Sequence, residues 1–206
     1  MDMTKGSLWN KILIFALPLA ACSILQQLFN SADVAVVGRF AGSEALAAVG
    51  GNGSVIALLI NLFTGLSVGA NVVISAYVGK KDQDKVKEAV HTVFVVALLS
   101  GGFLVLLGGL VAEPLLTIMG TPKEVLRLAV LYLRIYFCGM PFAMIYNFGS
   151  AILRSVGDTR RPLYCLILSG IINVILNLIF VVGFRLSVVG VALATVLANG
   201  VSATLM

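Results

Sequence analysis

Long apolar runs, separated by short charged clusters, dominate this chain of 206 residues. Six of the runs are each as long as the ~20 residues that an α-helix needs to cross a bilayer. The pattern predicts six transmembrane helices, at residues 9–38, 45–79, 86–112, 125–153, 163–184 and 187–206. The segments between them are too short to hold a separate extramembrane domain. We therefore expect an all-α integral membrane protein folded as a six-helix bundle.

Composition agrees with a bilayer environment and excludes several functions. Hydrophobic residues make up 60% of the chain and charged residues 11%, against about 25% charged residues in soluble domains. A nucleic-acid partner would need a soluble basic surface, which this pattern lacks. His91 is the only histidine, and no phosphate-binding glycine loop, nucleophile triad or metal-ligand set can be assembled. We expect no enzymatic activity and no cofactor, with the lipid bilayer as the main surroundings.

The basic residues predict the orientation, because Lys and Arg are retained in cytoplasmic segments. The N-terminus, the second loop and the fourth loop together hold nine of the 14 Lys and Arg residues. These nine are Lys5, Lys11, Lys80, Lys81, Lys85, Lys87, Arg154, Arg160 and Arg161. We expect a multi-pass protein of the inner (plasma) membrane with a cytoplasmic N-terminus.

Asp33 is an acid inside the first predicted helix. An ionisable group within a span costs at least ~2.5 kcal/mol on insertion scales, so it is a functional candidate by default. Asn30, Gln26 and Ser23 precede it by three, seven and ten residues. This spacing predicts a polar stripe on one face of the helix, leading into the bundle.

Two further helices carry polar pairs at a spacing of four residues. These are Asn173 with Asn177 in the fifth predicted span, and Thr195 with Asn199 in the sixth. If these faces meet Asp33, a carboxylate, amide oxygens and a hydroxyl converge on a site for a small hard cation or a proton. The alternative is that such residues only join helices by hydrogen bonds, each worth about 0.6 kcal/mol.

Two prolines inside spans predict hinges, because proline removes a backbone hydrogen bond from a helix. Pro18 lies about four helical turns before Asp33, and Pro141 interrupts the fourth span. A carboxylate and a kink on one helix suggest that the charge of Asp33 controls the bend at Pro18. A static packing kink is the alternative.

Several short motifs, in this order, resemble the MATE (multidrug and toxic compound extrusion) family of transporters over essentially the whole chain. The motifs are Leu17-Pro18-Leu19, Asn30-Ser-Ala-Asp33, Val37-Gly38, Arg154-Ser-Val-Gly157-Asp-Thr-Arg160-Arg-Pro162, Asn173-x3-Asn177 and Gly190-Val-Ala-Leu-Ala-Thr195. Each is weak alone, and their order and spacing make the resemblance specific.

The resemblance implies twelve helices in two lobes around a central cavity, with this chain as the N-terminal lobe and the C-terminal lobe absent. The last span ends at Met206 without a basic stop, which also suggests truncation near a midpoint. Members expel amphipathic organic cations in exchange for Na⁺ or H⁺.

Residue by residue, the resemblance implies a coupling-cation site at Asp33, Asn173, Asn177 and Thr195, with Na⁺ as a possible metal. It also implies that Gln26, Tyr132 and Asn147 line a substrate cavity, and we add Asn30 from the same stripe. Some relatives carry a carboxylate at the position of Asn177, so Asp33 is the sole acid here. Coupling to Na⁺ or to H⁺ stays open.

Two alternative functions compete with drug antiport. One is a flippase for lipid-linked sugars or polymers of the same superfamily, although its cavity should be more basic and no span here has a central Lys or Arg. The other is a non-transporting membrane scaffold, or a half-transporter that needs a partner, in which Asp33→Asn would be silent.

Overall fold

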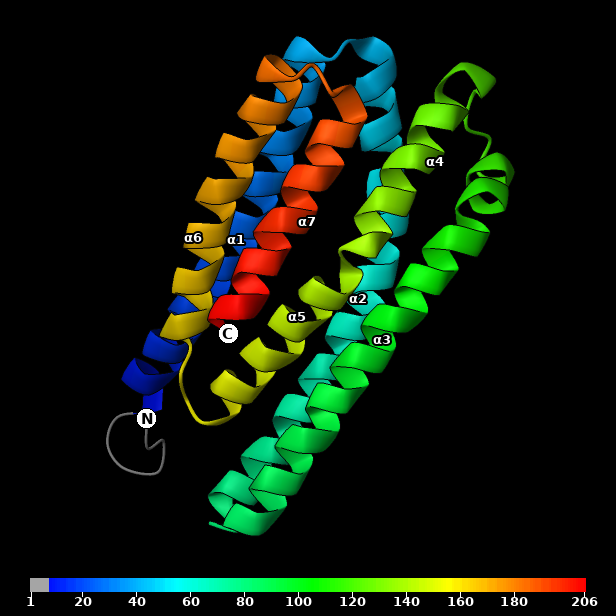
Figure 1. Cartoon of the computed structure of the whole chain (residues 1–206). Helices are drawn as coiled ribbons and strands as arrows, with labels where there is room; N and C mark the ends of the chain where they lie inside the picture. Colours follow the sequence, from blue (N-terminus) through cyan, green and yellow to red (C-terminus); the bar gives the residue numbers. More distant parts are fainter. Residues whose placement is uncertain (1–7) are drawn as a thin grey trace.

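The computed structural model describes residues 8–206, which form α-helices and one π-helix without any strand. The elements are α1 (Leu8–Phe40), α2 (Ser43–Gly79), α3 (Gln83–Ile118), α4 (Lys123–Cys138), α5 (Met140–Ser155), α6 (Arg160–Asn177), the π-helix η1 (Leu178–Gly183) and α7 (Ser187–Leu205). They form one elongated bundle (Figure 1).

Five helical segments of the described chain are long and apolar enough to cross a membrane: α1, α2, α3, α6 continued by η1, and α7. The pair α4 and α5 passes the same test together, bent by 48° at a short break. With this pair taken as one span, the predicted all-α six-helix bundle is confirmed.

The fourth span is not the single helix predicted for residues 125–153. Helix α4 ends at Cys138, Gly139 lies between the helices, and Pro141 falls in the first turn of α5. Proline is tolerated in a first turn because the amide it lacks has no partner there. The break predicted from Pro141 is therefore present, centred on Gly139.

Two other predicted helices are longer than the apolar runs suggested. Helix α3 begins at Gln83 and continues beyond residue 112 to Ile118, because Leu116 is buried and extends the packed face. Helix α6 begins at Arg160 instead of residue 163, because the Asp158 carboxylate accepts hydrogen bonds from the amides of Arg160 and Arg161. The charged residues that the prediction assigned to loops form the end turns of these helices.

Helices α4 and α5 occupy the middle of the bundle. They contact α2 and α3 on one side and α7 on the other, while α1 and α6 pack beside α7 (Figure 1). Phe137, Met140 and Met144, around the break, are fully buried. Leu110 and Ile118 show the opposite behaviour, with exposed fractions of 79% and 83%. The apolar exterior is suited to lipid.

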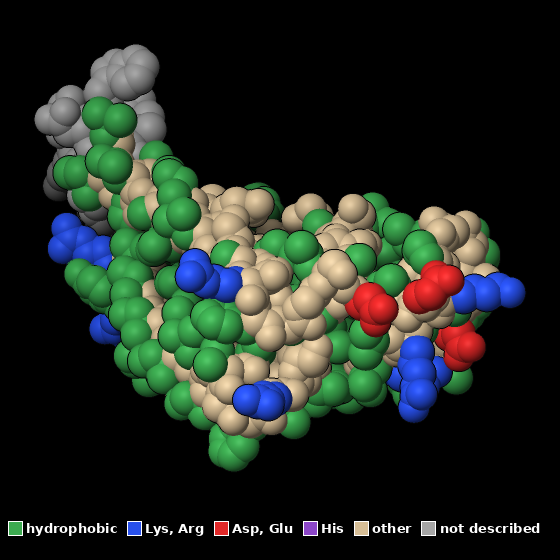
Figure 2. Space-filling model, turned by 90° about the horizontal axis from the view of Figure 1, so that it is seen from above, with side chains coloured by type: hydrophobic (Ala, Val, Ile, Leu, Met, Phe, Trp, Pro, Cys, Tyr) green, Lys and Arg blue, Asp and Glu red, His purple; other side chains and the backbone are tan. Residues whose placement is uncertain are grey.

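The two ends of the bundle carry different sets of charges. The start of α1, the α2–α3 turn and the α5–α6 loop share one end (Figure 1). These segments include the basic residues used to predict orientation, although Lys5 lies outside the described residues. Figure 2 views the other end, where acidic side chains lie beside basic ones at one edge. The cytoplasmic assignment of the first end stays a prediction.

Two asparagines of α2 bind the two halves of the bent span. Asn52 donates to the carbonyl oxygen of Ala129 in α4 at 2.9 Å, and Asn71 donates to that of Ala151 in α5 at 2.8 Å. Because the bonds lie on opposite sides of the break, α2 holds the bend in place.

Replacing Asn71 with alanine should weaken the bundle. Asn61, exposed on the same helix, supplies the matched control, since Asn61→Ala makes the same change in helix propensity without losing an interhelical bond. We expect Asn71→Ala to be less stable than Asn61→Ala by about 1 kcal/mol. Reversible unfolding in mixed detergent micelles measures the difference, and equal stabilities would contradict the role of the bond.

Candidate functional site

Asp33 lies near the end of α1 and is buried, with an exposed fraction of 7%. The other members of the predicted stripe, Ser23, Gln26 and Asn30, are exposed on the same helix. The prediction that the whole stripe leads into the bundle is therefore wrong. At 3.6 residues per turn the three residues point about 20° to 80° to one side of Asp33, which places them beyond the packed edge of α1.

Asn173 and Asn177 of α6 and Thr195 of α7 form a hydrogen-bonded cluster with Asp33, whereas the side chain of Asn199 takes no part in it within the described residues. Asn177, fully buried, donates through Nδ2 to Asp33 Oδ1 and to Asn173 Oδ1, the latter at 3.2 Å. Asn173 Nδ2 lies 3.4 Å from the hydroxyl of Thr195, which itself donates to the Val191 carbonyl oxygen at 3.0 Å. A continuous chain of hydrogen bonds thus joins α1, α6 and α7.

One oxygen of this cluster lacks a partner. Asn177 Oδ1 is buried and accepts no hydrogen bond within the described part of the chain. A buried unpaired polar atom costs about 1–3 kcal/mol, so it needs a compensating role. Beside a carboxylate, this oxygen is suited either to coordinate a hard cation or to accept a proton carried by Asp33.

The donor set suits an alkali cation or a proton better than a transition metal. The described residues contain no group of three or more His, Cys, Asp or Glu side chains that could hold a metal ion. One carboxylate, two amides and one hydroxyl offer only oxygen ligands with a single negative charge. The residues therefore fit Na⁺ or H⁺, the two ions expected from the sequence.

The π-helix η1 begins directly after Asn177. Such wider turns are rare and often mark functional sites. Sequence reasoning missed it, because residues 178–183 are the same apolar types that make up α6. The irregular segment forms one end of the span that carries Asn173 and Asn177.

Two tyrosines of α4 lie close together. Tyr132 and Tyr136 have ring centroids 5.9 Å apart. Tyr132 was predicted to line the substrate cavity, yet it is buried within the lobe. Tyr136 was not among the predicted site residues.

The other predicted cavity residues lie on separate surfaces. Gln26 and Asn30 are exposed on α1, and Asn147 is half-buried on α5. No hydrogen bond joins these three side chains to one another or to Tyr132 within residues 8–206. Their role as a substrate cavity stays a prediction.

The two predicted hinges differ in the structure. Helix α1 runs through Pro18 without interruption, so a hinge there stays a prediction. At the break near Pro141, Gly139 packs so closely on α7 that an added Cβ would lie 2.7 Å from Val196, the neighbour of Thr195. The bend therefore contacts the helix that supplies one residue of the cluster.

Comparison with known proteins gives consistent matches along the chain. A family model described as MatE matches residues 18–179. The curated protein "Probable multidrug resistance protein YoeA" of Bacillus subtilis (strain 168) is 32% identical over 200 residues, covering 95% of this chain and 43% of that protein. The chain thus spans less than half the length of this relative.

Solved structures match over nearly the whole chain. The outward-facing conformation of a multidrug resistance MATE family transporter of the MOP superfamily matches with a TM-score of 0.89 and 29% identity, covering 97% of this chain and 44% of that one. The inward-facing conformation of such a transporter gives a TM-score of 0.81 and 28% identity, covering 93% and 44%.

Proposed function

The chain belongs to the MatE family, and on this premise we propose that it is the N-terminal lobe of a cation-coupled exporter of amphipathic organic cations. The observation that carries the proposal is the buried Asp33 carboxylate beside the unpartnered Asn177 oxygen. Burying a carboxylate and an unpaired amide oxygen in an apolar lobe is unfavourable, so such a pair indicates a functional site, here one that binds a coupling ion. Na⁺ or H⁺ is that ion.

The hydrogen bonds suggest how the ion changes the lobe. Asn177 Nδ2 donates to Asp33 Oδ1, and an ion bound to the carboxylate would compete for the oxygens that accept this hydrogen bond. Turning the amide of Asn177 by about half a turn would present Oδ1 to the ion instead. Because Asn177 also binds Asn173, and Asn173 contacts Thr195, the change passes from α1 to α7.

Alternating access then follows from differential binding. An ion shifts an equilibrium between two conformations only by as much as it binds one of them more tightly. We propose that the ion favours the arrangement that releases substrate outward. One charge moved across 100 mV supplies about 2.3 kcal/mol for this step.

Efflux measurements on the full-length protein containing this chain test the proposal. Cells loaded with a fluorescent organic cation such as ethidium are given an inward Na⁺ gradient at constant pH, or a proton gradient without Na⁺. We expect one gradient to accelerate efflux and its collapse by the matching ionophore to stop it. An efflux rate that is independent of both gradients would contradict coupling. Absence of efflux would favour the flippase or scaffold hypotheses.

Thr195→Val tests the most exposed member of the cluster, since Asp33, Asn173 and Asn177 are all buried. Valine keeps the shape of threonine and removes the oxygen that contacts Asn173. Loss of one neutral ligand worth about 1.4 kcal/mol should raise the half-saturating ion concentration roughly tenfold. Thr204→Val, exposed on the same helix, is the control and should leave that concentration unchanged. Equal behaviour of the two variants would remove Thr195 from the site.

A further inference from the structure

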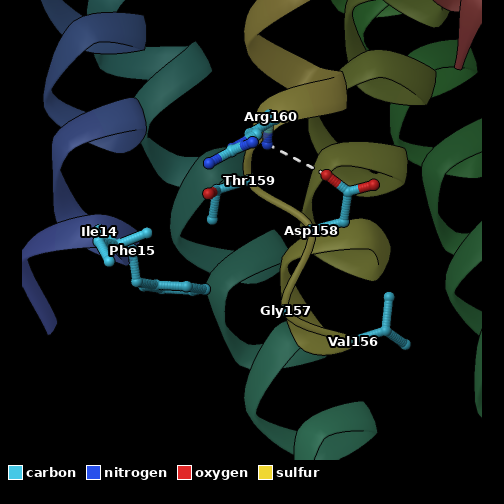
Figure 3. Close-up of a pocket in the computed structure, with 7 residues that line it drawn as sticks. All are labelled: Ile14, Phe15, Val156, Gly157, Asp158, Thr159 and Arg160. Carbon is cyan, nitrogen blue, oxygen red and sulfur yellow. Dashed lines mark hydrogen bonds between the residues drawn. The ribbon is translucent and has the colours of Figure 1, made fainter. Parts of the chain in front are cut away.

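A pocket lies at the opposite end of α1 from Asp33. It has a volume of about 370 Å³ and opens between the start of α1 and the α5–α6 loop (Figure 3). Its lining residues are Ile14, Phe15, Val156, Gly157, Asp158, Thr159 and Arg160. Phe15 and Asp33 are separated by 18 residues, or about 27 Å of helix, so the pocket is distinct from the cation cluster.

The pocket has one apolar and one polar wall. Ile14 and Phe15 of α1 form the apolar wall, with Val156 at the edge of the loop. Thr159 and Arg160 form the polar wall and point toward α1 (Figure 3). An amphipathic ligand would satisfy both walls.

Thr159 places a hydroxyl at the pocket. The residue is buried, with an exposed fraction of 5%, but its hydroxyl is not one of the fully buried unpartnered atoms of the described residues. Because Thr159 lines the pocket, a ligand there can accept a hydrogen bond from its hydroxyl.

The charges around the loop leave Arg160 uncompensated. Asp158 accepts the amides of Arg160 and Arg161 at 3.1 Å each and pairs with Arg161 Nε at 3.0 Å. Its carboxylate lies on the side of the loop away from Ile14 and Phe15 (Figure 3). Arg160 forms no ion pair within residues 8–206. The pocket therefore presents one free guanidinium to an anion.

We propose that this pocket binds the phosphate of an anionic phospholipid. The Arg160 guanidinium and the Thr159 hydroxyl donate to the phosphate oxygens, and the upper part of an acyl chain lies along Ile14 and Phe15. The apolar wall selects a lipid over a soluble anion. The bound lipid joins the start of α1 to the start of α6, the two helices that carry Asp33 and Asn177.

Lipid titration by native mass spectrometry tests the proposal on the purified chain in a neutral detergent. Dioleoyl phosphatidylglycerol is the probe, and the variants are Arg160→Gln and Thr159→Val. Removing one positive charge should weaken binding about fivefold, and removing the hydroxyl about threefold. Arg185→Gln, an exposed basic residue at the other end of the bundle, should bind as the wild type does.

Further probes distinguish the lipid from other sources of phosphate. Dioleoyl glycerol, which lacks the phosphate, should bind at least tenfold more weakly than phosphatidylglycerol. Inorganic phosphate that binds as tightly as the lipid would overturn the lipid assignment. Equal lipid binding by wild type, Arg160→Gln and Thr159→Val would overturn the site itself. Circular dichroism checks folding, and the isosteric Thr159→Val carries the test if Arg160→Gln does not fold.

Discussion

Asp33→Asn should abolish cation-driven export while leaving the lobe folded. Asparagine has nearly the same shape, so the packing between α1 and α6 is kept, whereas the only acid of the cluster disappears. A unit charge about 4 Å from a monovalent cation contributes about 4 kcal/mol at an effective dielectric constant near 20. Losing it corresponds to a roughly thousandfold weaker site.

Two measurements test this expectation. Ethidium efflux under the driving gradient should fall to the rate of cells without the transporter, and isothermal calorimetry should show no heat of ion binding to the purified variant. Glu88→Gln, an exposed acid at the start of α3, is the control for loss of a negative charge. Full gradient-driven efflux by Asp33→Asn would refute the proposed ion site and support the scaffold reading.

Gly101→Ala should destabilise the bundle strongly. A Cβ on Gly101 of α3 would lie 2.5 Å from the Cα of Pro141, which is backbone and cannot rotate away. Helices α3 and α5 would have to separate, and overpacking of this kind costs about 3 kcal/mol. This overpacking would occur at the break between α4 and α5, among the most buried residues of the lobe.

Gly102→Ala provides the control within the same helical turn. An added Cβ there meets no atom within 4 Å, so alanine only improves helix propensity, by about 1 kcal/mol. Unfolding in mixed micelles should place the two variants on opposite sides of the wild type. Equal midpoints for Gly101→Ala and Gly102→Ala would mean that the close approach of α3 and α5 is not needed for stability.

The bent fourth span is a feature that the hydrophobic pattern predicts only in part. Pro141 correctly indicated a break, but the apolar run continues across it, so no change of pattern reveals two helices. The bend is held by contacts from outside the span: Asn52 and Asn71 of α2, Gly101 of α3 and Val196 of α7. These partners are distant in sequence, and local propensity carries no information about them.

The residues of the cation cluster were also predicted only in part. Spacing alone placed Asn173 and Asn177 on one face and singled out Asp33 as costly in a membrane. It also grouped Gln26 and Asn30 with Asp33, although only Asp33 is buried. The rotation of α1 about its own axis is decided by packing against α6, and a periodic pattern defines a face only to within a broad arc.

By itself, the sequence determined the membrane class, the six spans, the alternation of basic segments and the identity of the costly polar residues. These follow from the free energy of moving each residue from water to lipid, which depends on residue type and order along the chain. Only the tertiary structure decided the 48° bend, the π-helix after Asn177, the unpartnered Asn177 oxygen and the pocket at Arg160. Each of these depends on which helices touch and at what rotation, and that is determined by packing among side chains far apart in the chain.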